Sequence, residues 1–86
     1  MNFRAFVRVS LKKSILDPQG DAVRRALLSM GYDGVADVRV GKHLELLLSA
    51  PDEEAARDLV DEVSRKLLAN PVTEVYEFDL QEESGR

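Results

Sequence analysis

The sequence has 86 residues, enough for one domain with a thin hydrophobic core. Its formal net charge of −4 disfavours nucleic acid and anionic membranes as partners. It has no cysteine and one histidine, His43, which excludes disulfides, thiolate metal sites and cysteine–histidine catalytic pairs. With strand-like residues at its start, no signal peptide and no apolar run of membrane-spanning length, we expect a cytoplasmic protein without cofactors.

The first half of the chain predicts a strand and a helix. Apolar and polar side chains alternate in residues 3–11, as in a strand buried on one face. Asp17 and Pro18 predict a helix start, because aspartate caps helix N-termini and proline is tolerated at the first helical position. Gly31 is the expected left-handed stop. Gly20 is unusual in a first helical turn, so something close to its backbone should explain it.

Residues 36–48 form the third predicted element, in which the apolar side chains keep one parity across Gly41. A two-residue hairpin turn at Gly41 and Lys42 would divide this apolar set between two faces. The pattern therefore favours one long strand, bent or bulged at Gly41, with a three-residue turn as the alternative.

The second half ends with a helix, a strand and a polar tail. Pro51 opens the helix, and Asn70 ends it because a residue before proline avoids the helical region. Residues 72–80 then predict a strand with alternating apolar residues. Residues 1–80 should form a single domain, and residues 81–86 a flexible C-terminal tail.

This order of elements predicts an α+β fold. The expected architecture is a two-layer sandwich, with two helices on one face of an antiparallel sheet, close to the ferredoxin-like pattern. The other sheet face is then open. Phe6, Leu47 and Val75 lie out of phase with the helix-facing residues, so we expect them on the open face as the contact between two copies of a homodimer.

The residues that could carry chemistry lack the surroundings of an active site. No catalytic motif surrounds any serine, and we interpret His43 as a solvated or interface residue. Asp52, Glu53 and Glu54 are better explained as charges that compensate a helix dipole than as metal ligands. The chain alone is therefore predicted to catalyse nothing.

Two segments break local propensity, the turn at residues 17–21 and the bend around Gly41. We predict that both contact other protein chains, although a bare solvated bend is an equal alternative for the second. The predicted contact residues are Asp17, Gln19, Gly20, Arg39, Gly41 and Lys42.

Particular strings of the sequence carry more information than its periodicity. In order, they include Leu16-Asp17-Pro18-Gln19-Gly20, Val38-Arg39-Val40-Gly41-Lys42 and Leu68-Ala69-Asn70-Pro71-Val72. In these strings and their spacing, over residues 3 to about 80, the chain resembles the PurS family, the small subunit of phosphoribosylformylglycinamidine synthase.

The resemblance implies a non-catalytic subunit of an ATP- and glutamine-consuming ligase in de novo purine biosynthesis. That enzyme converts formylglycinamide ribonucleotide to formylglycinamidine ribonucleotide. The implied partners are further copies of the chain, in a homodimer or a higher oligomer, together with a PurQ-type glutaminase and a PurL-type synthetase. The subunit would bridge these two enzymes and assist ammonia transfer. From the residues alone, a ferredoxin-like small-molecule sensor domain remains the alternative.

Overall fold

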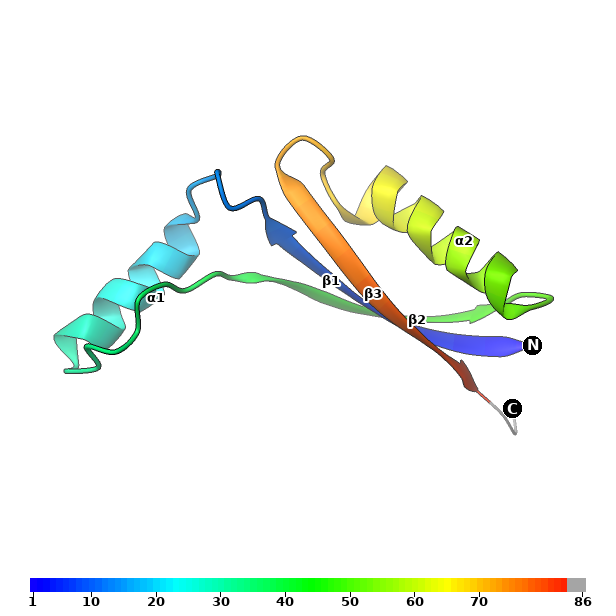
Figure 1. Ribbon diagram of the computed structural model, residues 1–86, viewed down its shortest axis with the longest axis horizontal. Helices are drawn as coiled ribbons and strands as arrows, with labels where there is room; N and C mark the ends of the chain where they lie inside the picture. The colour runs from blue at the N-terminus through cyan, green and yellow to red at the C-terminus, as the bar shows by residue number, and fades with distance from the viewer. Residues whose placement is uncertain (84–86) are drawn as a thin grey trace.

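The computed structural model of the chain describes residues 1–83 (Figure 1). Three strands and two helices alternate along it, as the sequence predicts, and a π-helical turn, η1, continues the second helix. The elements are β1 (Asn2–Leu11), α1 (Pro18–Ser29), β2 (Gly41–Ser49), α2 (Glu53–Val63), η1 (Ser64–Leu68) and β3 (Glu74–Glu83).

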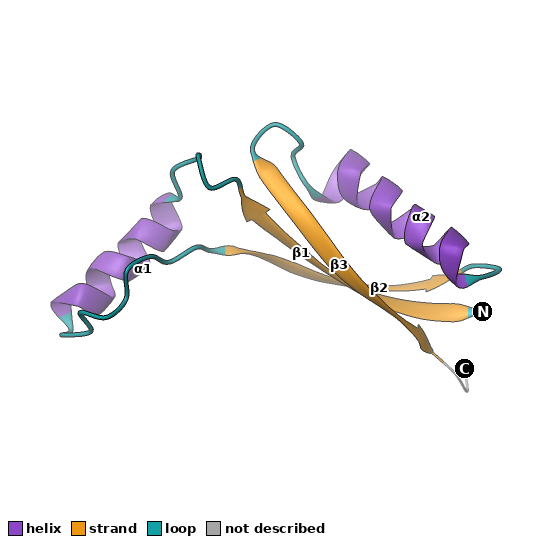
Figure 2. Cartoon of the chain, viewed as in Figure 1, coloured by secondary structure: helices purple, strands orange, loops and turns teal. Residues whose placement is uncertain are grey.

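The strands form an antiparallel sheet in the order β2-β1-β3, with β1 in the centre (Figure 2). Successive β1 residues alternate between buried and half-buried, which confirms the predicted period-2 pattern. The register places Val7 opposite Leu44 on β2 and Phe78 on β3, so the apolar residues of all three strands share one face. The predicted assignment of faces is therefore confirmed.

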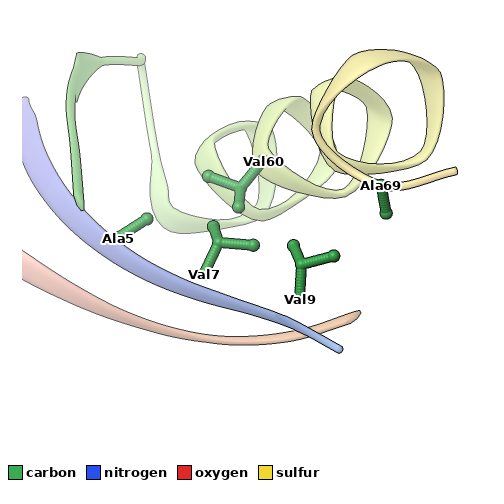
Figure 3. Close-up of a cluster of buried hydrophobic side chains, with 5 residues drawn as sticks. All are labelled: Ala5, Val7, Val9, Val60 and Ala69. Atoms are coloured by element: carbon green, nitrogen blue, oxygen red, sulfur yellow. The ribbon is translucent and has the colours of Figure 1, made fainter. Parts of the chain in front are cut away.

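The hydrophobic core lies between this face and α2. Ala5, Val7 and Val9 of β1 pack against Val60 of α2 and Ala69 beyond η1, and all five are buried (Figure 3). Leucines of β2 and the large side chains of β3 surround this cluster and are partly buried. This small core is all that the chain can form with one helix on its sheet.

The helix α1 departs from the predicted architecture, because it does not lie over the sheet. The loop after β1 and the extended residues 35–40 carry it beyond the end of the sheet, where it stands apart from α2 (Figure 1). Gly20 is the only one of its residues that is buried. The apolar stripe of a helix normally packs against another element, but the strands and α2 do not pack on the stripe of α1.

The extended segment before β2 answers the question left open at Gly41. There is no hairpin: residues 35–40 run on into β2, but pairing with β1 begins only at Gly41. The backbone of Gly41 lies close to β1: a Cβ on this residue would be 2.4 Å from the Val9 carbonyl oxygen. The predicted long strand is thus paired over its second part alone.

Three predicted boundaries need correction. The α2 helix begins after Asp52, whose carboxylate accepts a hydrogen bond of 2.8 Å from the amide of Ala55, so Pro51 precedes the cap. The last strand starts at Glu74, because a turn held by the Asn70 side chain and carbonyl occupies the residues before it. Residues 81–83 pair with β1 and belong to the sheet rather than to a tail, whereas residues 84–86 lie outside the described part.

Candidate functional site

The predicted contact residues come together where α1 joins the rest of the molecule. Asp17 caps the helix as predicted: its Oδ1 accepts a hydrogen bond of 3.0 Å from the Gly20 amide. Its Oδ2 accepts a second bond, 2.8 Å long, from the amide of Val40. The Asp17 side chain is buried. The hydrogen bond from Gly20, followed by the one from Val40, lowers the pKa of its carboxyl below the ordinary value.

Gly20 is required by the same junction. A Cβ at this position would lie 2.1 Å from the carbonyl oxygen of Val38, a separation that no side chain can tolerate. The backbone of residues 38–40 therefore lies directly against the first turn of α1. This confirms the expectation that a close backbone approach explains the glycine.

Arg39 completes the junction from the opposite direction. Its Nη1 donates to the Ile15 carbonyl oxygen at 2.9 Å, and its Nη2 to that of Lys13 at 2.7 Å. Lys42 reaches a different element, donating to the Leu68 carbonyl at the end of η1 at 3.0 Å. Gln19 is exposed beside these residues. Most of the predicted contact residues are thus engaged within the chain.

We call residues 12–40 the arm, and the contacts between residues 13–20 and residues 38–40 the root clasp. The part of the clasp that sequence reasoning missed is the link from Asp17 to Val40. The sequence indicates that Asp17 caps the helix. It does not indicate which group bonds to the second carboxylate oxygen, because that depends on the tertiary structure. The sequence does contain one signal of this contact, because Gly20 is an unfavourable residue for the first turn of a helix.

The arm exposes apolar side chains. Val23 is 43% exposed and Met30 68%, and Ala26 and the half-buried Leu27 lie between them at helical spacing. We call these four residues the arm stripe. Although α2 has a comparable stripe that meets the sheet, the arm stripe faces no other element of the described chain.

The sheet face away from α2, which we call the open face, is mainly charged. Arg4 is ion-paired with Glu45 on one side and Glu83 on the other. Arg8 lies 3.0 Å from both Glu77 and Asp79. These hydrogen-bonded carboxylates raise the pKa values of both guanidinium groups.

The three residues expected on the open face are all there, but they do not form a cluster. Phe6 lies in the middle of β1, with its ring 5.8 Å from that of His43. Leu47 lies opposite Arg4, and Val75 lies opposite Ser10, roughly 20 Å further along β1 at the rise of a strand. Leu47 and Val75 are therefore separate exposed residues among charges.

Catalytic and metal chemistry find little support in the described residues. Within residues 1–83 there is no group of three or more histidine, cysteine or acidic side chains placed to hold a metal ion. The His43 ring on β2 is tilted by 31° to the Phe6 ring on β1, and no serine of residues 1–83 is hydrogen-bonded to it. None of the described helices is long and apolar enough to span a membrane.

The α+β fold, the small core and the exposed apolar residues of the arm are typical of a small subunit that binds other protein chains. Residues 4–82 match the family model described as PurS, phosphoribosylformylglycinamidine (FGAM) synthase. The chain belongs to the PurS family.

Curated relatives and solved structures agree with this assignment. The chain is 49% identical over 80 residues to the phosphoribosylformylglycinamidine synthase subunit PurS of Bacillus subtilis, covering 93% of this chain and 94% of the relative. Its fold superposes on a crystal structure of B. subtilis PurS with a TM-score of 0.80 at 48% identity, covering 93% and 99% of the two chains. A chain in the structure of PurLQS from Thermotoga maritima gives a TM-score of 0.86 at 30% identity, covering 94% and 99%.

Proposed function

We propose that this chain is the non-catalytic small subunit of phosphoribosylformylglycinamidine synthase. In this role it supports the ATP- and glutamine-dependent conversion of formylglycinamide ribonucleotide to formylglycinamidine ribonucleotide, in the cytoplasm. The family match over residues 4–82 carries the proposal. The proposal that the subunit is non-catalytic is supported by the composition, because the sequence has one histidine and no cysteine. The alternative, a small-molecule sensor domain, receives no support from the relatives.

The proposed partners are a PurL-type synthetase and a PurQ-type glutaminase, which the subunit bridges while assisting ammonia transfer. The Thermotoga maritima chain with a TM-score of 0.86 comes from a structure named PurLQS, a name that combines PurL, PurQ and PurS. A small domain without a catalytic site can act in such an assembly only through its surfaces.

We also propose that the subunit self-associates as a homodimer. For a chain of this length, a compact domain has a radius of gyration of about 12 Å, whereas the observed value is 16.7 Å. Its accessible surface of 6,017 Å² exceeds that of a typical folded monomer of the same mass by about 900 Å². This excess matches what one partner contributes to a standard interface, about 800 Å².

The arm stripe is the proposed contact between copies. It is apolar, three of its four residues are exposed, and the extended residues 35–40 beside it have no strand partner in the described chain. The predicted contact through Phe6, Leu47 and Val75 remains a prediction. Charged residues separate these three side chains, and desolvating ion pairs offsets the gain from burying them.

Reconstitution tests the proposed function. Glutamine-dependent FGAM synthesis is measured with the purified synthetase and glutaminase, with and without this chain. We expect the chain alone to show no glutaminase, ATPase or ligase turnover, and to raise glutamine-dependent synthesis by the other two. Turnover by the isolated chain, or no effect of adding it, would contradict the proposal.

A further inference from the structure

The root clasp fixes the base of the arm with reciprocal hydrogen bonds. The loop before α1 supplies the Asp17 carboxylate, which accepts a hydrogen bond from the Val40 amide in the segment after α1. The segment after α1 supplies a guanidinium, Arg39, which donates to two carbonyl groups of the loop before α1. Each of the two connections is therefore held by the other.

The clasp is also sterically tight. Gly20 presses against the Val38 carbonyl so closely that a single added carbon atom would separate the two segments. Asp17 is only 6% exposed, so water competes poorly for its two oxygens. Beyond the clasp, α1 makes few contacts with the strands or with α2, and the turn that follows it, through Gly31 and Tyr32, bonds back only to its last turn.

We propose that the root clasp sets the direction of the arm before a second copy binds, so that the arm stripe is preorganised for docking. Without the root clasp, α1 would be joined to the sheet by two flexible connections. Docking would then have to restrict the motion of the whole arm. Such ordering costs affinity, and a prearranged element avoids that cost. This inference rests on the proposed homodimer, but the direction of the arm can be measured on a single chain.

The first measurement is an intrachain distance. Because the chain has no cysteine, Ser29→Cys on α1 and Glu54→Cys on α2 accept two spin labels specifically, and both positions are exposed. The labels are placed in a Met30→Asp background, which removes the proposed docking, and their separation is measured by pulsed dipolar spectroscopy. We expect one narrow distance distribution.

Substitutions in the clasp should broaden that distribution. Gly20→Ala forces the two segments apart, and Asp17→Asn replaces one accepting oxygen with a donor while keeping the side-chain shape. Gly34→Ala is the matched control, because a Cβ there meets nothing within 4 Å. A distribution that stays narrow in both clasp variants would show that the clasp does not set the arm direction, and would overturn the inference.

The second measurement is self-association of unlabelled chains with Met30 intact. We expect Gly20→Ala and Asp17→Asn to raise the dimer dissociation constant at least about tenfold, while Gly34→Ala leaves it unchanged. The far-UV circular dichroism of the chain should keep its folded spectrum, since the sheet and α2 do not depend on packing against α1. A broadened arm with an unchanged dissociation constant would overturn the role in docking, and a wild-type chain that stays monomeric would overturn both this role and the homodimer. Neither outcome depends on FGAM synthesis, so the bridging function is judged separately.

Discussion

Ser64 begins the π-helical turn and is completely buried. Its hydroxyl oxygen has no hydrogen-bond partner among the residues that the structure describes. The Ser64 carbonyl accepts a bond of 2.9 Å from the Ala69 amide, so the backbone of the turn is satisfied while the side chain is not. A buried hydroxyl without a partner is destabilising, because it has lost its bonds to water.

We therefore expect Ser64→Ala to stabilise the chain by about 1 kcal/mol, by removing this hydroxyl and improving helix propensity. Urea unfolding followed by circular dichroism measures the change. Ser29→Ala serves as the control, because that serine is exposed and donates to the Ala26 carbonyl. A loss of stability in Ser64→Ala would mean that the hydroxyl has a partner in solution, such as a buried water molecule.

Tyr76 provides a pH-dependent test at the same scale. Its hydroxyl donates to the Asp61 carboxylate at 2.6 Å, tying β3 to α2, and this bond together with burial raises the pKa of the tyrosine. The raised pKa means that the folded chain favours the neutral phenol. The resulting stabilisation is complete below the ordinary tyrosine pKa of about 10, and is lost as pH rises through the higher folded value.

Tyr76→Phe should lower the free energy of unfolding by about 1 kcal/mol at neutral pH, the value of one partly exposed hydrogen bond. The difference between wild type and variant should then shrink as the pH rises, because only the wild type loses stabilisation from this group. Urea midpoints measured from neutral to strongly alkaline pH check this expectation. A difference that grows with pH would contradict the assigned direction of the pKa.

At the scale of elements, the two helices show how far the sequence can be read. Both stripes are visible in the sequence, and the parity of the strands correctly separates the face under α2 from the open face. The sequence does not reveal that the arm carries α1 away, because an apolar stripe requires a partner without identifying its chain. Nor could it show that Asp17 bonds to Val40, which depends on how the arm folds back.

Adjacent leucines of β2 test the two faces directly. Leu46 packs on the core cluster, so Leu46→Asp places an unpaired charge beneath α2 and should unfold the domain. Leu47 is 62% exposed and lies opposite Arg4, so Leu47→Asp should stay folded, with a stability change within about 1 kcal/mol.

Circular dichroism reports folding of the two variants, and sedimentation reports their association. Under the arm proposal Leu47→Asp remains self-associated, whereas a folded monomer would restore the open face as the contact between copies. If both variants unfold alike, both sheet faces contribute to the core and the assignment of an open face fails.

At the scale of the whole molecule, the chain is thin and extended, measuring 51 × 30 × 14 Å. Large apolar side chains such as Met30 and Val72 are exposed, and only a few apolar residues of the described chain are fully buried. A domain of this size is only marginally stable alone. Assembly and stability should therefore be coupled, because a partner that binds only the folded chain stabilises it by mass action.

The coupling predicts that the urea midpoint rises with protein concentration. Met30→Asp, in the arm stripe, should remove this dependence and lower the midpoint to that of the wild type at high dilution, because it places a charge in the proposed contact. Leu28→Asp is the matched control: it makes the same apolar-to-acidic change on the other side of α1, and should retain the concentration dependence. A wild-type midpoint that does not vary with concentration would contradict the proposal that the arm stripe joins two copies.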